Sequence, residues 1–303
     1  MRYLLLVILI LNLGCSSNEK SKGTKKELTP EDKEFGWIEN SAFEKVDEVA
    51  FNSNQDLFEQ VSSDDSLSKE SISRLPTPKI EEVASSNDPV SQGIGKCYGK
   101  NFTEADKIFE ANYKRYKNNP AYWNQVGTCQ FLKGEYRKAL LFYNKARTLN
   151  ANYAPPVNNI GVIHQRQGRD QKALAAFKKA VELNKFSLTP IFNLAQLYLK
   201  YGFVDKSQNI FKTLYNKNSD DIDVLNALGT GQLLKENYSV SINYFSKIPR
   251  GKLSNPKYGL NFAIALKAGG RVKDAKAVFD RIDTKSMGDL GGYYNKVGRY
   301  LNE

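Results

Sequence analysis

Small residues recur along the C-terminal two thirds of the chain at an unbroken interval of 34 residues. This small-residue column consists of Ala105, Ala139, Ala173, Ser207, Ser241 and Ala275. One helical turn later an aromatic column keeps the same interval, with Phe109, Tyr143, Phe177, Phe211, Phe245 and Phe279. Matches in six successive windows identify an internal repeat, and the spacing of four residues predicts a helix with one apolar face in each repeat.

A second column of small residues lies upstream of the first and predicts a partner helix in every repeat. Its members are Gly93, Gly127, Gly161, Ala195, Gly229 and Ala263. Paired helices approach closely only where neither carries bulk. We therefore expect Gly161 to face Ala173, while Phe177 fills the gap to the next helix pair.

A third column lies between the two helices of each repeat, where a turn is needed. It contains Lys100, Gly134, Gly168, Gly202, Glu236 and Gly270. Glycine takes a positive φ at the C-cap of a helix without the steric cost that other residues bear. Four glycines in six positions therefore predict a tight turn that ends the first helix.

These columns together resemble the tetratricopeptide repeat family, whose pattern has a 34-residue period. The match is closest in residues 121–150, which carry Trp123, Gly127, Ala139 and Tyr143. The resemblance implies an all-α, right-handed superhelix of about six helix-turn-helix repeats. The implied repeats are 86–119, 120–153, 154–187, 188–221, 222–255 and 256–289. Residues 290–303 continue the register as a capping helix, with Tyr293, Val297 and Tyr300 on one face.

Two repeats depart from the pattern. Pro249-Arg250-Gly251-Lys252 follows directly after Ile248, and proline cannot continue a helix, so the second helix of repeat five should end early. In the first repeat, Lys96 and Lys100 stand where an aromatic residue and a glycine are expected. Such degeneracy is typical of terminal repeats.

The N-terminus has the layout of a secretory signal peptide, with Arg2, an apolar run over residues 3–11 and Leu13-Gly14-Cys15. The run is too short to cross a bilayer core of about 30 Å as a helix. Gly14 before Cys15 resembles the lipobox of bacterial lipoproteins, although Asn12 departs from it. We expect a signal peptide at 1–14 and acylation at Cys15, which would hold the protein on a membrane surface.

Two alternatives remain for this segment, an ordinary cleaved signal and an uncleaved hydrophobic anchor, and both export the chain. Ser16 after the cysteine resembles lipoproteins that are sorted to the outer membrane. The expected location is therefore the bacterial cell envelope, on the periplasmic face of the outer membrane.

Charge divides the chain into an acidic and a basic part. Residues 16–85 contain 9 Lys+Arg and 16 Asp+Glu, whereas residues 86–303 contain 34 and 17. The acidic part is too poor in apolar residues to fold alone, so residues 15–85 are expected to form a mostly disordered tether. Within it, the apolar residues of 30–62 are spaced as in one or two short amphipathic helices, and a transient helix in a disordered arm is the alternative.

Few residues could support catalysis, so we expect neither an enzyme nor a cofactor or metal. His164 is the only histidine and stands in a column of the first helices that normally packs. Cys97 and Cys129 are the only cysteines besides Cys15, and both fall in predicted helices of neighbouring repeats. An exported compartment would permit a disulfide between them, but the pattern favours two small buried hydrophobic side chains.

Amide side chains recur in the first helices, which in this family line a concave face that holds extended peptides. The candidate groove residues are Asn124, Gln125, Asn158, Asn159, Asn193, Gln196, Asn226 and Asn261. A carboxamide both donates and accepts, so a regular row can pair with the main chain of a peptide of any sequence. The alternative is that asparagine is simply common at this place in the family.

The signal peptide and the repeats together predict a membrane-anchored scaffold that binds proteins or extended peptides and assembles or stabilises an envelope complex. Tetratricopeptide lipoproteins of this kind serve pilus assembly, gliding motility and outer-membrane assembly. The alternative is a basic module that binds the cell wall or another anionic polymer. Nucleic acid is not an expected partner of an exported chain, whereas the acidic tether itself is a possible ligand of the basic repeats.

Overall fold

The computed structural model describes residues 84–303, and within this range it contains thirteen α-helices and no strand. The first helices of the six pairs are α6 (Pro89–Tyr98), α8 (Pro120–Leu132), α10 (Ala154–Arg166), α12 (Leu188–Lys200), α14 (Ile222–Leu234) and α16 (Pro256–Ala268). Their partners are α7 (Phe102–Tyr116), α9 (Tyr136–Leu149), α11 (Asp170–Leu183), α13 (Val204–Lys217), α15 (Tyr238–Ser246) and α17 (Val272–Phe279). The last helix is α18 (Gly291–Asn302). The predicted signal peptide, Cys15 and residues 30–62 lie outside the described residues.

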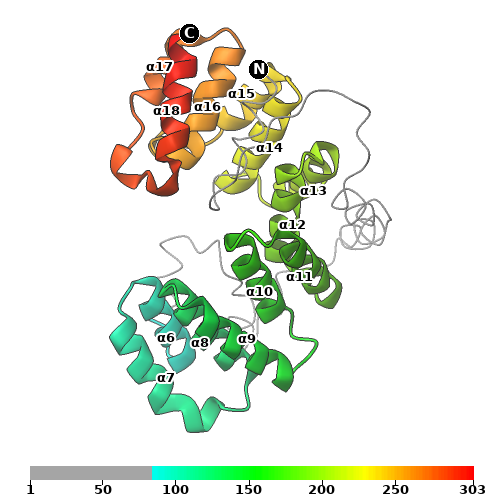
Figure 1. The fold of residues 1–303 in the computed structure, drawn as a ribbon, viewed down its shortest axis with the longest axis vertical. Helices are drawn as coiled ribbons and strands as arrows, with labels where there is room; N and C mark the ends of the chain where they lie inside the picture. The colour runs from blue at the N-terminus through cyan, green and yellow to red at the C-terminus, as the bar shows by residue number, and fades with distance from the viewer. Residues whose placement is uncertain (1–83) are drawn as a thin grey trace.

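The helix pairs stack one on the next in chain order. In Figure 1 they run from α6 and α7 at the bottom of the view to α16, α17 and α18 at the top. The prediction of an all-α right-handed superhelix of helix pairs is confirmed. No helix in residues 84–303 has both the length and the apolar character that crossing a bilayer requires.

The first helices begin at residues that cap or favour a helix N-terminus. The side chain of Asp88 accepts a hydrogen bond from the backbone N–H of Ser91 at 2.7 Å, and that of Asn119 accepts one from Ala121 at 2.8 Å. Proline occupies the first position of α6, α8 and α16, where its missing N–H is not needed. These local signals mark the start of several first helices, whereas α12 begins without a side-chain cap.

The turn column adopts the predicted left-handed conformation in all six repeats. Gly134, Gly168, Gly202 and Gly270 have φ between 71° and 83°. Lys100 and Glu236 take the same conformation, with φ of 62° and 61°, although side chains disfavour it. The position in the repeat, and not the residue type, therefore sets the turn.

The two small-residue columns and the aromatic column build the core. The columns that begin at Ala105 and Gly93 are buried throughout, and five of the six aromatic residues are buried as well. The prediction that Phe177 fills the gap to the next helix pair needs correction. A Cβ atom on Gly161 would lie 2.7 Å from ring carbon Cε1 of Phe177 and 3.1 Å from Cβ of Ala176, so the ring is the nearest neighbour.

The same arrangement recurs in other repeats, where Gly127 lies against Tyr143 and Gly229 against Phe245. Each of these glycines thus packs against the aromatic ring of its own repeat. In these repeats the ring packs against the first helix of its own pair, where a residue without a side chain leaves room for it.

Helix α15 ends at Ser246, before Pro249, as the sequence predicts. A short 3₁₀ turn over Arg250–Lys252 follows it. Helix α17 is also short, which the sequence does not predict. The backbone N–H of Asp283 donates to the carbonyl of Ser254 at 2.8 Å, so the chain after α17 is tied to the loop before α16.

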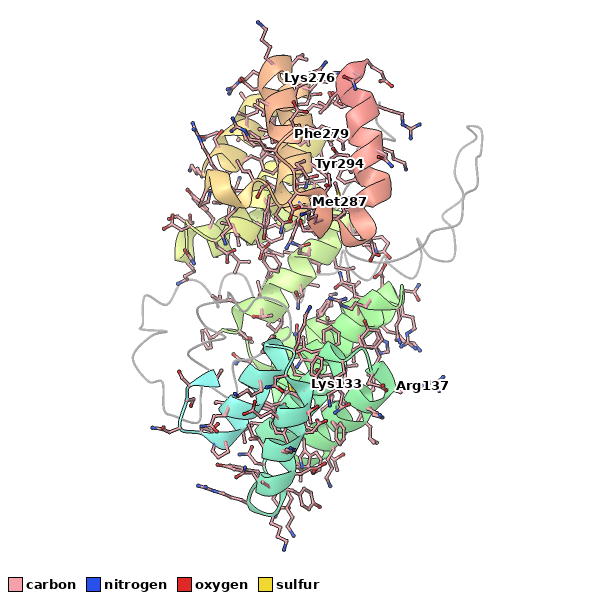
Figure 2. The ribbon with its side chains drawn as sticks, turned by 90° about the vertical axis from the view of Figure 1, so that its left-hand side faces the viewer. Lys133, Arg137, Lys276, Phe279, Met287 and Tyr294 are labelled. Carbon is pink, nitrogen blue, oxygen red and sulfur yellow. A yellow bond between two sulfur atoms is a disulfide. The ribbon has the colours of Figure 1, made fainter. Side chains whose placement is uncertain are left out.

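The capping helix α18 packs on the sixth pair. Its buried residues are Tyr293, Val297 and Leu301. Tyr300, predicted for this face, is only half-buried. Figure 2 shows Phe279 and Tyr294 together between α17 and α18, and their rings stack at a centroid distance of 4.4 Å. Phe279, the last residue of the aromatic column, therefore packs on the capping helix.

Candidate binding surface

The predicted groove amides lie mostly inside the stack. Seven of the eight are buried, and Gln196 is half-buried. Asn124, Asn158 and Asn159 have no exposed surface. A polar group in the interior is costly without a hydrogen-bond partner. The partners of these amides therefore indicate whether the amides serve packing or ligand binding.

Four of these asparagines form a chain of side-chain hydrogen bonds across α8, α10 and α12. The Nδ2 of Asn193 donates to Oδ1 of Asn158 at 2.9 Å, and Nδ2 of Asn158 donates to Oδ1 of Asn159 at 3.2 Å. The Nδ2 of Asn159 in turn donates to Oδ1 of Asn124 at 3.0 Å. The first helices of repeats two, three and four are thereby joined.

A second polar chain joins α14, α16 and α18. The Nδ2 of Asn261 donates to Oγ1 of Thr230 at 3.3 Å, and the hydroxyl of Tyr293 donates to Oδ1 of Asn261 at 3.0 Å. The hydroxyl of Thr230 donates to the carbonyl of Asn226 at 2.7 Å. The capping helix thus continues the polar contacts between repeats.

These chains change the interpretation of the amide row. Four of the eight amides are joined to one another across successive first helices, and Asn261 bonds to Thr230 and Tyr293, so these five side chains are engaged within the stack. Peptide binding by these residues stays a prediction. The chain of buried hydrogen bonds favours one placement of each repeat on the next, because such bonds are lost when the geometry changes.

Cys97 on α6 and Cys129 on α8 form a disulfide, with their Cα atoms 5.3 Å apart. The favoured prediction of two separate buried thiols is therefore wrong. Stacking of successive first helices brings residues 32 positions apart within bonding distance. The bond fixes the degenerate first repeat to the second.

His164 is half-buried on α10, and its Nδ1 has no hydrogen-bond partner among residues 84–303, so the expected satisfied packing position is not what the structure shows. Partial burial, followed by the positive charges of Arg169 and Lys172, lowers the pKa of its imidazole below the ordinary value of 6.5. The side chain is therefore neutral near pH 7. Across residues 84–303 no three His, Cys, Asp or Glu side chains gather as they would around a metal ion.

A cleft of about 480 Å³ lies between repeats five and six, and the sequence did not predict it. Apolar residues line its interior, among them Ile248, Leu253 and Phe262. Arg250, Arg271 and Arg281 also line it and are exposed. The early end of α15 shortens the wall on this side, so the break at Pro249 was the available signal.

Comparison with known proteins agrees with this geometry. Residues 154–186 match the model of a tetratricopeptide repeat. No curated protein sequence matches the chain. Solved structures share the fold at low sequence identity.

The structure of PilF from Pseudomonas aeruginosa superposes with a TM-score of 0.58 at 15% identity, covering 74% of this chain and 98% of that one. PilW, a widely conserved type IV pilus biogenesis factor, gives 0.55 at 16% identity, covering 70% and 96%. The Cut9–Hcn1 assembly of APC/C gives 0.58 at 16% identity, covering 74% of this chain and 44% of the other.

The period of 34 residues, the left-handed turns, the ring-on-glycine contacts and the match in the third pair agree on one architecture. Residues 84–303 form a solenoid of tetratricopeptide-type helix pairs.

Proposed function

We propose that this chain is a lipid-anchored scaffold of the bacterial cell envelope that holds proteins together in an assembly. The stacked helix pairs carry this proposal, because they present a long continuous surface built on a rigid core. PilW, whose fold is similar, is a type IV pilus biogenesis factor. We propose the same class of task, assembly of an envelope machine, for this chain.

The proposed location rests on two independent features. Cys15 follows an apolar segment and Gly14, in the arrangement that precedes acylation in bacterial lipoproteins. The Cys97–Cys129 bond favours an oxidising compartment, because disulfides persist outside the cytosol and are rare within it. Together these features support export followed by anchoring on the periplasmic face of the outer membrane.

The scaffold proposal is tested by crosslinking the full chain in its native cell and identifying the captured proteins by mass spectrometry. We expect a reproducible set of envelope proteins, recovered with the membrane fraction. A Cys15→Ser variant should leave the membrane fraction and lose those proteins that are captured only at the membrane. Recovery of no protein above a tag-only control would contradict the proposal.

A second candidate, binding of a cell-wall or other anionic polymer, is favoured by charge. The repeats carry 34 basic and 17 acidic residues, and three arginines line the cleft between repeats five and six. Exposed charges are screened beyond about 8–10 Å at physiological ionic strength. Polymer binding should therefore collapse between low and physiological salt, whereas protein binding through apolar contacts should persist.

Matched variants separate the cleft from general charge. Arg250→Glu with Arg281→Glu should weaken polymer binding more than Lys178→Glu with Lys179→Glu on α11, which changes the net charge equally. Equal losses in the two double variants would assign binding to the whole basic surface, and no loss in either would reject the polymer function.

The acidic tether is a further proposed ligand of the basic repeats. Residues 30–62 combine acidic and aromatic residues, which suits a basic surface with apolar clefts. If the tether competes with partners, its deletion in the full chain should increase partner affinity. Unchanged affinity would remove this proposal.

A further inference from the structure

Aromatic rings gather around a cleft of about 360 Å³ between the first two repeats. The rings belong to Phe109, Tyr113, Tyr122, Trp123 and Phe142, which lie on α7, α8 and α9. Trp123 is central, because it stacks on Phe142 at 5.6 Å and meets the rings of Tyr113 and Tyr122 edge-on at 6.0 and 5.2 Å. Tyr113 is 46% exposed, so a ligand can reach this group of rings, which we call the aromatic cleft.

The repeat columns explain why the cleft is open here. Gln130 lines it, and the equivalent residue two repeats later is Tyr198, whose ring is buried to 2% exposure. Asp106 also lines it, and its equivalent is the buried Leu174. Gln130 and Asp106 thus stand where the equivalent interface two repeats later has a tyrosine and a leucine.

Two carboxylates border the rings. Asp106 pairs with Lys133 at 2.6 Å, whereas exposed Glu110 forms no ion pair with any residue of 84–303. Burial, followed by the neighbouring Tyr113 and Glu110, raises the pKa of Tyr122 in the wall of the cleft. Glu110 and the aromatic rings therefore line the same cleft.

Several other rings of the solenoid lie beneath cations of the chain itself. Arg115 lies 5.2 Å from the ring centre of Tyr116, Arg166 lies 5.1 Å from that of Phe131, and Lys267 lies 4.4 Å from that of Tyr300. Among the described residues no lysine or arginine lies in this way over Tyr113, Trp123 or Phe142. The aromatic cleft thus offers electron-rich rings beside the carboxylate of Glu110, while Lys133 is paired with Asp106.

We propose that the aromatic cleft binds the guanidinium group of an arginine side chain presented by a partner protein. The planar guanidinium stacks on aromatic rings and its N–H groups pair with the carboxylate of Glu110. A basic ligand is repelled by the rest of a body with 34 basic and 17 acidic residues, so its binding is confined to a local site such as this one. The inference rests on the proposed scaffold function and names one contact through which a partner is held.

The two tryptophans of the chain, Trp37 and Trp123, give a direct measurement. In full-length protein with Trp37→Phe, Trp123 is the sole source of tryptophan fluorescence. Titration with the peptide acetyl-Gly-Arg-Gly-amide should produce a saturable change in its emission. The same peptide with lysine in place of arginine should bind severalfold more weakly. The same peptide with glutamate in place of arginine should produce no saturable change. Equal binding of the arginine and glutamate peptides would overturn the proposal, as would equal binding of arginine peptide and tetramethylammonium.

Variants of exposed residues test the contact without disturbing the core. Glu110→Gln and Tyr113→Leu should each weaken binding of the arginine peptide by about two- to fivefold, as expected for an exposed ion pair and an exposed cation–π contact. Glu182→Gln on α11 removes an equivalent charge far along the chain and should have no effect. Equal affinities in Glu110→Gln, Glu182→Gln and parent protein, with unchanged circular dichroism, would refute the assignment.

Failure of this inference is distinguishable from failure of the scaffold proposal. Retention of every crosslinked partner by the Glu110→Gln, Tyr113→Leu double variant would reject the cleft as a contact while the scaffold stands. Loss of specific partners in that variant, with the fold intact, would support both.

Discussion

Gly161 and Phe177 fit each other: a methyl group on Gly161 would lie 2.7 Å from the ring of Phe177, closer than side-chain carbons pack. Gly161→Ala should therefore lower the free energy of unfolding by up to about 2 kcal/mol. Overpacking costs about 1–3 kcal/mol, and the better helix propensity of alanine offsets about 1 kcal/mol of that cost. Urea denaturation followed by circular dichroism measures the change.

A double-mutant cycle identifies the ring as the cause. Gly161→Ala should cost less in a Phe177→Leu background, because the smaller side chain leaves room. Gly292→Ala in α18 is the matched control, since nothing lies within 4 Å of its added Cβ, and it should not destabilise the protein. Additive costs at Gly161 and Phe177 would contradict the contact.

In the left-handed turns, two substitutions should change the free energy of unfolding in opposite directions. Glu236 has a φ of 61°, so Glu236→Gly should relieve strain and raise the free energy of unfolding by up to about 1 kcal/mol. Gly202, with a φ of 80°, is the counterpart, and Gly202→Ala should lower it by about 1 kcal/mol. Thermal and urea unfolding of the two single variants measure both effects, and a shift of the same sign in both would contradict this account.

Removing one amide of the buried chain should cost more than removing an exposed one. Asn158→Ala leaves the amide of Asn193 without its acceptor and Oδ1 of Asn159 without this donor, so we expect a loss of about 1–3 kcal/mol. Asn243→Ala, at an exposed position on α15, should change stability by less than about 0.5 kcal/mol. Equal small effects in urea denaturation would mean that the buried chain contributes nothing.

The lowered pKa of His164 predicts a pH dependence with a definite sign. Because the folded protein disfavours the protonated imidazole, the unfolded chain binds more protons between the folded pKa and about 6.5. The stabilising effect is complete above pH 6.5 and is lost as the pH falls through the folded pKa. NMR titration of the single imidazole should give a pKa below 6.5, and His164→Gln should lose less stability on acidification than the parent.

Much of the fold follows from the sequence because a fixed period constrains every repeat alike. The columns of Ala173 and Phe177 are spaced by one helical turn, and the turn at Gly168 must reverse the chain in every window. Even Lys100 and Glu236 adopt the turn that the period demands. Local residue preference matters less here than the stacking of neighbours.

Contacts between repeats were harder to predict, because they depend on how far each pair rotates on the next. Cys97 and Cys129 meet only through that stacking, and Asn158 reaches Asn193 for the same reason. The aromatic cleft escaped notice for a different reason. Gln130 lines this cleft, whereas Tyr198 is buried at the equivalent position two repeats later. A repeat pattern shows which side chains recur, but it does not show where a smaller side chain leaves a cleft.

The bond between α6 and α8 also makes the N-terminal end of the solenoid sensitive to redox conditions. Neither cysteine has a partner within its own repeat, so the bond is a covalent link between two repeats. Reduction would leave the first repeat held on the second by noncovalent contacts alone. Counting alkylated cysteines would report the fraction of molecules in which this link is closed.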